Sequence, residues 1–444
     1  MGIVWVKMMD RNVAAGPETA AYTVVMKFGG TSVADAERVR RAAERIVAAK
    51  EAGSRVVAVL SARGKTTDDL VAMAYEVSER PDPREMDMLL STGERISCAL
   101  TAMVINDLGH EAISLTGSQA GIVTDTSHTK ARILDVRAGR IDAALSDGKI
   151  VLVAGFQGVS TAADVTTLGR GGSDTTAVAL AAALGGDCEI YTDVAVVFSA
   201  DPRIVPDARK LTQASFEEML EMSASGARVL QLRSVEYARN HGVRIHCRSS
   251  FEDRPGTWVL TEEETMERPL VTAVTHSTDE ARVTLTGLPD EPGVAGRVMT
   301  ALAEANVNVD MIIQNEPESE GREADMSFTV PRDDLMAARE ALAPLRAELG
   351  IADVASDARM GKVSLVGAGM RSYPGVAAKT FSVLGDAGIN IEMISTSPIK
   401  ISVVVREDDV PKAVLELHTA FGLDADAVRP EDPRGVHRPT VPSR

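Results

Sequence analysis

The sequence predicts an α/β protein in which a domain with a mainly parallel sheet, covered by helices on both faces, is followed by two small α+β units. The first observation is that between residues 22 and 260 short β-rich runs, such as YTVVMKF, RVVAVLS, IVLVAGF and CEIYTDV, alternate with alanine-rich helical stretches. Strands that alternate with helices favour crossover connections, which place neighbouring strands parallel. Ligands of such sheets bind beyond the carboxyl ends of the strands, so we expect the chemistry in the loops that follow these runs.

The second observation is an internal repeat that follows the polar stretch TEEETMERP. The segment VTLTGLPDEPGVAGRVMTALAEANVNVDMIIQN is echoed by VSLVGAGMRSYPGVAAKTFSVLGDAGINIEMISTS, so each copy reads as strand, turn, amphipathic helix and strand. A duplicated unit of this kind after an enzyme domain is typical of a ligand sensor or a subunit-pairing module. Apolar residues at a four-then-three spacing are expected on one helical face of each copy: Ala295, Met299 and Leu302, then Ala377, Phe381 and Leu384.

The chain has 444 residues and a formal net charge of −17. This length exceeds what one hydrophobic core usually supports, so we expect several domains. The predicted bounds are an N-terminal extension at 1–21, the α/β domain at 22–262, a linker and first repeat at 263–358, the second repeat at 359–430 and a disordered tail at 431–444. The negative charge disfavours binding to nucleic acid or to a membrane surface, and the apolar runs are interrupted before they reach the length of a membrane span.

The cysteines indicate a reducing compartment. Cys98, Cys188 and Cys247 are odd in number and far apart, which favours buried thiols over a disulfide framework or a zinc site. Residues 1–21 lack the long apolar core of a signal peptide, and we interpret them as an extension or a misassigned start. We therefore expect a cytoplasmic protein.

The first candidate for phosphate binding is MKFGGTSV, at the end of the first predicted strand. Gly29 and Gly30 would let the backbone amides approach a phosphate, and Lys27 could neutralise charge on a transferred group. The order of lysine and glycines differs from a Walker loop and from the dinucleotide fingerprint. The alternative is a plain tight turn before a helix that begins near Asp35.

A second glycine-rich loop, TTLGRGGSDTTA, enters an alanine-rich helix. Ser173 and Asp174 are suited to capping that helix, which is the structural alternative to a binding role. Capping does not account for Arg170 between glycines, because an arginine among free amides at a helix start is suited to an anion such as a carboxylate or a γ-phosphate.

Two further segments carry acidic residues. In EIYTDVAVVFSADPRIV, oxygen ligands near a phosphate would suit magnesium, although an Asp-Pro turn explains Asp201 equally well. In STGERISCAL, Glu94 and Arg95 stand at the start of a helix, where Glu94 could hold a substrate ammonium or simply stabilise the helix dipole.

Together these pieces resemble the bacterial aspartokinases, in order, from about Tyr22 to Leu423. The resemblance rests on KFGGTSV, STGERIS, GFQG, TTLGRGGSDTTA, YTDV, ADPRIV and SFEEMLEM, followed by the paired repeats, which resemble ACT domains. It implies the three-layer amino-acid-kinase fold with two ferredoxin-like ACT domains, ATP and Mg²⁺ as cofactors, L-aspartate as acceptor and 4-phospho-L-aspartate as product, in the first step of lysine, threonine and methionine biosynthesis.

The resemblance also implies roles for individual residues. Lys27 and Asp193 would be catalytic, with Lys27 on the transferring phosphoryl group and Asp193 positioning magnesium and the lysine. Magnesium itself would be held mainly by the ATP phosphates. The implied aspartate site comprises Thr66, Glu94 on the ammonium, Arg170 on the α-carboxylate, Ser173 and Asp174. The implied ATP site comprises Lys27, Phe28, Gly29, Gly30, Thr192, Asp193, Phe198, Asp201, Arg203 and Arg228. Because the attacking carboxylate is already ionised at neutral pH, positioning and charge neutralisation should dominate catalysis.

The chain departs from the family pattern at two places in the nucleotide segment. Ala195 and Val196 stand where the family commonly has Asp-Gly, and Phe198 replaces a tyrosine, which removes a phenol hydrogen bond. Arg228 stands where a lysine usually reaches the phosphates, and a planar guanidinium does not reproduce the geometry of an ammonium. These changes predict a weaker or altered ATP site.

The ACT resemblance implies lysine or threonine, or both, as feedback inhibitors. A Pro-Gly turn before a helix offers free amides to a carboxylate. The implied effector residues are Asp290, Val294, Ala295, Asn308 and Gln314 in the first repeat, and Val376, Asn390 and Ile391 in the second. Met266 stands where some relatives start a shorter regulatory subunit, so the partners implied are further copies of this chain or short chains that begin near Met266. Packing of the repeats without a ligand is the alternative.

Two other functions remain open on the sequence. One is a kinase of the same fold acting on glutamate, acetylglutamate or a nucleoside monophosphate, against which STGERIS and the twin ACT repeats argue. The other is a catalytically weakened amino-acid sensor, which the changes at Ala195 and Val196 favour and the presence of Lys27, Glu94, Arg170 and Asp193 opposes.

Overall fold

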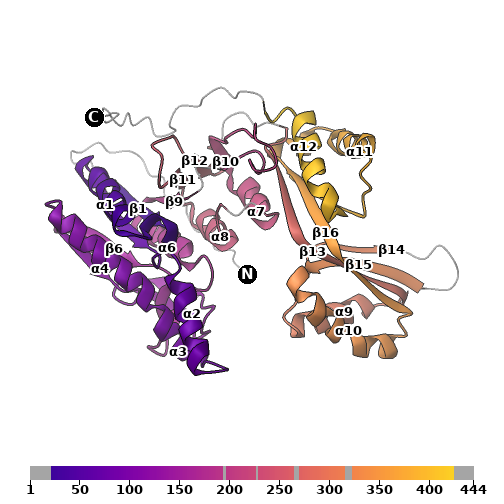
Figure 1. Ribbon diagram of the computed structural model, residues 1–444, viewed down its shortest axis with the longest axis horizontal. Helices are drawn as coiled ribbons and strands as arrows, with labels where there is room; N and C mark the ends of the chain where they lie inside the picture. The colour runs from indigo at the N-terminus through magenta and orange to yellow at the C-terminus, as the bar shows by residue number, and fades with distance from the viewer. Residues whose placement is uncertain (1–21, 194–196, 227–228, 265–269, 316–322, 425–444) are drawn as a thin grey trace, which may run out of the picture.

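A computed structural model describes residues 22–193, 197–226, 229–264, 270–315 and 323–424. The expected segments 1–21 and 431–444, as well as Ala195, Val196, Arg228 and Met266, lie outside the described residues. Figure 1 shows a part with a layered sheet at one end of the molecule and an elongated part built from β13 and β16 at the other.

The first part is centred on a mixed sheet with the strand order β10-β12-β11-β9-β1-β2-β6-β3. All its pairings are parallel except that between β11 and β12. The strands are β1 (Thr23–Phe28), β2 (Arg55–Leu60), β3 (Ala112–Leu115), β6 (Ile150–Ala154), β9 (Asp187–Thr192), β10 (Gln213–Ser215), β11 (Ile245–Ser249) and β12 (Thr257–Leu260). The predicted mainly parallel sheet is confirmed.

Helices cover both faces of this sheet, because successive residues of its central strands are apolar and point to opposite sides. In β1, Val25 packs in the core under α5, α6, α7 and α8, whereas Val24 and Met26 pack in the core under α1 and α4. The helices are α1 (Ala36–Glu51), α2 (Thr66–Val77), α3 (Pro83–Leu90), α4 (Thr92–Asp107), α5 (Gly139–Ser146), α6 (Gly172–Leu184), α7 (Phe216–Ala224) and α8 (Leu232–His241). The result is the predicted three-layer domain (Figure 1).

A second, small sheet lies beside the first and supports the glycine-rich loop before α6. Its strand order is β5-β4-β7-β8, formed by β4 (Ile122–Thr124), β5 (Ile133–Val136), β7 (Gln157–Ser160) and β8 (Val165–Thr167). The hairpin of β7 and β8 ends where the loop that carries Arg170 begins.

Among the described residues, the stretch Pro83–Asp107 is long and apolar enough to pass a length-and-composition test for a membrane span, and half of its tested window is buried. In the structure this stretch is α3 and α4, and Cys98, Ala102 and Ile105 of α4 pack against the central sheet. All three cysteines are buried free thiols, as expected.

The two repeats form one antiparallel sheet with the order β14-β15-β13-β16-β18-β17. Its strands are β13 (Ala273–Pro289), β14 (Ile312–Asn315), β15 (Glu323–Pro331), β16 (Asp353–Val366), β17 (Met393–Ser397) and β18 (Lys400–Arg406), and its helices are α9 (Val294–Glu304), α10 (Leu335–Leu349), α11 (Val376–Asp386) and α12 (Val410–Ala420). The first part of β13 pairs with the last part of β16, between Ala273 and Val366. The start of β13, which precedes the first repeated motif in sequence, therefore pairs with the strand of the second repeat.

The core-facing stripe of each repeat helix differs from the expected one. The buried residues of α9 are Val294, Val298 and Leu302, so Ala295 is exposed and Met299 only partly buried. In α11 the stripe is Val376, Thr380 and Leu384. The prediction was right for Leu302 and Leu384, but for the other positions it chose residues one place further along the chain. Both sets of residues are mostly apolar in these helices, so the spacing alone does not show which set faces the core.

Candidate active site and regulatory cavity

The candidate active site is centred on Lys27, the next-to-last residue of β1. Its Nζ lies 2.5 Å from Oδ1 of Asp174, with the two side chains 12% and 9% exposed. Asp174 lies in the first turn of α6, whose N-cap is Gly171 and lacks a side-chain cap. Ser173 and Asp174 therefore do not cap the helix, and the capping alternative is wrong.

The loop after β1 is a tight backbone junction. A Cβ on Gly30 would lie 2.7 Å from the carbonyl oxygen of Ala62, so only glycine fits between these two loops. Gly29 is the N-cap of the short 3-10 helix η1 (Gly30–Val33), and α1 follows with Asp35 as its N-cap, as predicted. The Gly29 amide also donates to the carbonyl of Tyr191, which brings the end of β9 beside the loop.

Glu94 closes the other side of this junction. Its Oε1 accepts a hydrogen bond of 3.2 Å from the backbone amide of Ala62, while its Oε2 is buried and has no hydrogen-bond partner among the described residues. The side chain is 3% exposed, and this burial raises the pKa of Glu94 to about 7. A buried carboxylate with a free oxygen is suited to a cationic ligand.

Thr66 and Gln157 contact the neighbours of Glu94 in the chain. A Cβ on Gly93 would lie 3.6 Å from the methyl group of Thr66, so Thr66 lies against the residue that precedes Glu94. Gln157 Nε2 donates to the carbonyl oxygen of Ser91, and Arg95 donates to Gln157 Oε1. The motif GFQG contributed to the family resemblance, but Gln157 was given no role. A polar amide side chain within that motif, directly after a predicted buried strand, could have identified it.

Arg170 lies in an exposed loop between two glycines with left-handed backbone, Gly169 at φ 77° and Gly171 at φ 73°. The side chain of Ser173, in the first turn of α6, lies against Gly155, the residue after β6, because a Cβ on Gly155 would meet its Oγ at 2.7 Å. The loop therefore opens toward the same edge of the sheet as Lys27, with a guanidinium free of ion pairs among the described residues.

The predicted nucleotide residues divide into two groups. Thr192 and Asp193 end β9 beside β1, and the Thr192 hydroxyl donates to Asp193 Oδ1. Phe28 is a core side chain stacked on Tyr191 with ring centroids 4.7 Å apart, so only its backbone can face a ligand.

Phe198, Asp201 and Arg203 lie further along the chain. Phe198 forms an isolated bridge with Lys210. Arg203 pairs with Asp201 at 2.6 Å, and this hydrogen bond lowers the pKa of Asp201. None of their described contacts reaches Lys27, so their part in ATP binding stays a prediction. In the described residues, no group of three or more His, Cys, Asp or Glu side chains could hold a metal ion.

The segment around Asp201 instead packs on the second repeat. Ala200 and Val205 belong to the same core as α11 and α12, and the Ser199 hydroxyl lies 2.9 Å from Nε2 of His418. The Val274 amide donates to the Ser199 carbonyl. This junction was not predicted, because it joins residues about 220 positions apart in sequence.

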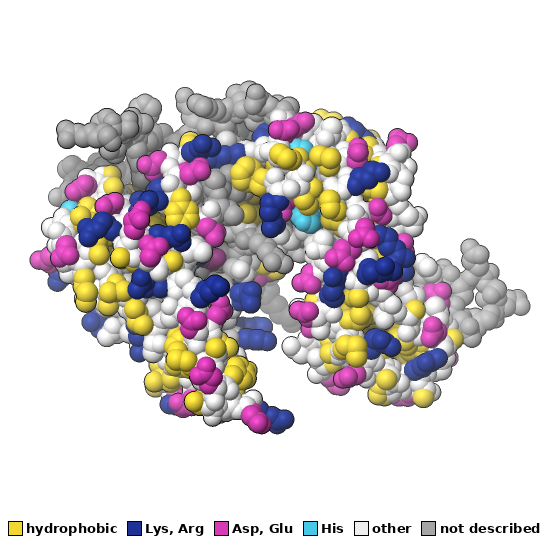
Figure 2. Space-filling view, viewed as in Figure 1, with side chains coloured by type: hydrophobic (Ala, Val, Ile, Leu, Met, Phe, Trp, Pro, Cys, Tyr) yellow, Lys and Arg dark blue, Asp and Glu magenta, His cyan; other side chains and the backbone are white. Residues whose placement is uncertain are grey.

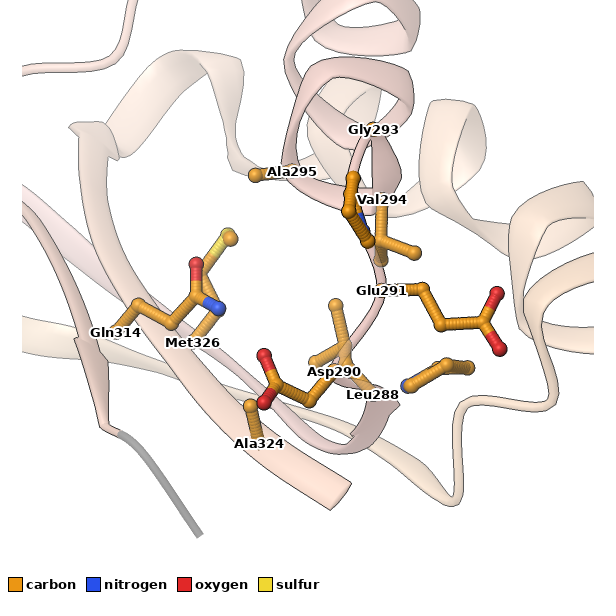
Figure 3. Close-up of a pocket in the computed structure, with 11 residues that line it drawn as sticks. Leu288, Asp290, Glu291, Gly293, Val294, Ala295, Gln314, Ala324 and Met326 are labelled. Carbon is orange, nitrogen blue, oxygen red and sulfur yellow. The ribbon is translucent and has the colours of Figure 1, made fainter. Parts of the chain in front are cut away.

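A cavity of about 480 Å³ lies in the first repeat, at the start of α9 (Figure 3). Four of the five residues expected to bind an effector in this repeat line it, namely Asp290, Val294, Ala295 and Gln314, whereas Asn308 is exposed and is not a lining residue. Figure 3 shows the Asp290 and Gln314 side chains directed into the hollow and Glu291 directed away from it. In the second repeat, Val376 and Ile391 pack in the core, and Asn390 donates to Glu392.

Comparisons with known proteins agree with this arrangement. Residues 22–249 match the Amino acid kinase family, and residues 283–344 and 363–421 match the ACT domain. The fold and the site thus define an amino acid kinase with ACT domains.

The chain is 58% identical over 407 residues to the aspartokinase of Mycobacterium tuberculosis, which covers 91% of this chain and 97% of that relative. Aspartokinase III of E. coli in complex with aspartate and ADP, in the R-state, has a TM-score of 0.74 at 27% identity and covers 89% of this chain and 99% of its own. The same enzyme with lysine and aspartate, in the T-state, has a TM-score of 0.70 at 27% identity, over 90% and 99%. The chain belongs to the aspartokinase family and is a kinase enzyme.

Proposed function

We propose that this kinase transfers the γ-phosphoryl group of ATP to the side-chain carboxylate of L-aspartate and forms 4-phospho-L-aspartate. The observation that carries the proposal is Glu94, a buried carboxylate that has one unpaired oxygen and accepts a hydrogen bond through the other from Ala62, whose carbonyl oxygen lies against Gly30. An acid in this position is suited to the ammonium of an amino acid, with Arg170 across the edge for the α-carboxylate. The relative in the R-state was solved with aspartate and ADP, which supports both substrates.

The reaction needs little covalent chemistry from the protein. A side-chain carboxylate oxygen forms a bond to the γ-phosphorus, the bond from phosphorus to the β,γ-bridging oxygen breaks, and ADP leaves with the electron pair. No proton is removed from the acceptor, since it is already ionised. Lys27 neutralises charge on the transferred group, and Asp174 fixes the direction of its ammonium.

Magnesium fits this site only as an ion held mainly by phosphate. Asp193 lies at the carboxyl end of β9 beside the Lys27 loop, exposed and with one oxygen hydrogen-bonded by Thr192. A single protein carboxylate is compatible with Mg²⁺, which keeps much of its shell as water and phosphate oxygen. When bound, Mg²⁺ supplies further charge neutralisation on the phosphates.

Trapping of the acyl phosphate as its hydroxamate tests the proposal. The protein is incubated with ATP, Mg²⁺, hydroxylamine and L-aspartate, and with glutamate or N-acetylglutamate in place of aspartate. A nucleoside monophosphate is tested by ADP release, because its product is a phosphoanhydride that gives no hydroxamate. We expect hydroxamate from aspartate alone and no ADP release with the nucleoside monophosphate. Turnover of another acceptor would move the function to a related kinase, and failure to bind ATP in a calorimetric titration would move it to the amino-acid sensor that Ala195 and Val196 raised as an alternative.

We further propose that lysine or threonine, or both, inhibit by binding in the cavity at the start of α9. The first-turn amides of α9, whose N-cap Gly293 has no side-chain cap, are suited to the effector carboxylate. Asp290 and Gln314 are suited to its ammonium. The T-state relative was solved with lysine, which supports an amino-acid effector. This regulation would control the first step of lysine, threonine and methionine synthesis.

The route from the repeats to the active site that we propose runs through α7. Glu218 of α7 is 5% exposed and accepts hydrogen bonds from Thr272 Oγ1 at 2.6 Å and from the Ala368 amide at 3.1 Å, so it joins α7 to the second repeat. After α7, a Cβ on Gly226 would lie 1.9 Å from the His276 carbonyl oxygen of β13.

The same stretch of chain continues to the substrate loop. Gln231 lies against Gly171, where a Cβ would approach its Cγ to 2.1 Å. A shift of β13 against α7 would therefore move the backbone that flanks Arg170. Such a two-position element is what coupling between separate sites requires.

For assembly, we propose further copies of this chain or short chains that begin near Met266 as partners. All six strands of the regulatory sheet, from β13 to β18, follow Met266 in sequence. A chain that begins there would contain every strand that the sheet needs. Detection of a second product of about the length of residues 266–444 in cell extracts, by an antibody against the tail, would test this.

A further inference from the structure

A fully buried carboxylate, Asp87 of α3, lies outside the residues assigned to binding or catalysis. It is 0% exposed and has hydrogen bonds on both oxygens. Oδ1 accepts from the hydroxyl of Thr167 at 2.5 Å, and Oδ2 lies 2.7 Å from Nδ1 of His128. Both oxygens lie 3.1 Å from the backbone amide of Thr129. Burial of a carboxylate costs several kcal/mol, and these hydrogen bonds are what offset that cost.

The partners of Asp87 form the base of the loop that carries Arg170. Thr167 is the last residue of β8, three positions before Arg170. Thr129 has a left-handed backbone at φ 67°, and its carbonyl oxygen would lie 3.1 Å from a Cβ on Gly169. Asp87 therefore fixes the strand that leads into the loop and the backbone against which Gly169 turns.

The helix that carries Asp87 leads directly to Glu94. α3 ends at Leu90, and after Ser91 the chain continues as α4, in whose first turn Glu94 lies. Gln157 fixes this connection by donating to the Ser91 carbonyl oxygen at 2.8 Å. One carboxylate thus links the segment that holds Glu94 to the segment that holds Arg170.

We propose that Asp87 is a positioning residue for the amino-acid substrate, which sets the spacing between Glu94 and Arg170. The proposal rests on the proposed function, in which these two side chains hold the ammonium and the α-carboxylate of aspartate. A misplacement of about 1 Å in a group that binds substrate can lower the rate by a factor of about 100. Because Asp87 holds the segments that carry Glu94 and Arg170, we expect its loss to weaken the use of aspartate rather than the binding of ATP. Lys27 and the Gly29-Gly30 loop do not contact Asp87 in the described residues, so the phosphate side should be unaffected.

The experiment measures KM for aspartate, KM for ATP and kcat in Asp87→Asn and in the pair Thr167→Val and Thr167→Ser. Thr167→Val removes the hydroxyl with little change in shape, and Thr167→Ser restores it. We expect Asp87→Asn and Thr167→Val to raise KM for aspartate about tenfold or more while KM for ATP changes less than about twofold, and Thr167→Ser to return KM for aspartate near that of the wild type.

Asp164→Asn is the matched control. It breaks the exposed ion pair between Asp164 and Arg84, which also joins α3 to the chain just before β8, and it should leave every constant unchanged. Equal changes in both KM values, or a loss of active protein with both KM values unchanged, would show that Asp87 is merely structural and would overturn the proposal. Wild-type protein that forms no aspartyl hydroxamate would instead overturn the proposed function itself, so the two failures are distinguishable.

Discussion

Lys27 and Asp174 form a nearly buried ion pair in which Nζ and Oδ1 lie 2.5 Å apart, at the point where β1 and the first turn of α6 meet. The pair holds the ammonium at the carboxyl edge of the sheet, where we propose that the transferred phosphoryl group is bound. Charge neutralisation with fixed geometry is the main contribution a protein makes to phosphoryl transfer.

Lys27→Met should lower kcat by a factor of about 100 to 1,000, because one preorganised cation is lost from the transition state. It should also destabilise the fold by about 3 kcal/mol, because Asp174 is left buried without its partner. The double variant Lys27→Met/Asp174→Asn should regain most of the stability and none of the activity, in urea unfolding and hydroxamate assays. Arg137→Met, which breaks an exposed pair with Asp135, is the control and should change neither.

Glu94 should make stability depend on pH. Burial raises its pKa from 4.5 to about 7, so the folded protein binds this proton more tightly than the unfolded chain does. Stability from this group is complete below about pH 4.5 and is lost as the pH rises through 7, a difference of about 3 kcal/mol. Glu94→Gln should therefore exceed the wild type in free energy of unfolding at about pH 8 and match it near pH 5. A constant difference across this range would contradict the assignment.

The same shift should affect substrate binding. Only ionised Glu94 attracts an ammonium, so the KM for aspartate should rise as the pH falls below about 7, while the KM for ATP stays nearly constant. In Glu94→Gln the KM for aspartate should be high at every pH between about 5.5 and 8.5. A wild-type profile as flat as that of the variant would show that this carboxylate does not hold the ammonium.

Asp290 is expected to bind the ammonium of the effector. Asp290→Asn should weaken inhibition by lysine or threonine about tenfold or more, without changing kcat or the KM for aspartate, because the cavity lies in a separate domain. Glu291→Gln is the matched control, since Glu291 points away from the hollow (Figure 3). Isothermal titration of each amino acid would measure binding directly, and equal loss in both variants would argue for a long-range charge effect.

Thr272→Val should uncouple the repeats from the kinase domain. It removes the hydroxyl that donates to Glu218, so the inhibitor should still bind with nearly unchanged affinity while the maximal inhibition falls. Thr272→Ser keeps the hydroxyl and should retain inhibition. If Thr272→Val were inhibited as fully as the wild type, the contact between α7 and the second repeat would not be the route.

Features that depend on neighbouring residues in the sequence were predicted correctly. The layered fold and the helix after Asp35 followed from the pattern of apolar runs, glycines and capping residues, whereas four of the five first-repeat residues that line the cavity came from the resemblance to ACT domains. Figure 2 shows acidic and basic side chains interspersed over the visible face, although the net charge of the chain is −17.

Long-range packing was beyond prediction. The pairing of Lys27 with Asp174, the clamp at Asp87 and the crossing of β13 into the sheet of the second repeat all join segments that are distant in sequence. Core placement of Phe28 was missed for a related reason, because strand residues alternate between faces and only the neighbouring Tyr191 shows which face is closed.

The most direct test of the account compares aspartate with two truncated acceptors in the wild type and in Glu94→Gln. Succinate lacks the ammonium and β-alanine lacks the α-carboxylate, and kcat/KM is measured for each by hydroxamate formation. If Glu94 holds the ammonium, the wild type should prefer aspartate over succinate by a factor of about 100 or more, and Glu94→Gln should lose most of that preference while keeping its discrimination against β-alanine. An unchanged preference for aspartate over succinate in Glu94→Gln would contradict the account, because the ammonium would then be recognised elsewhere.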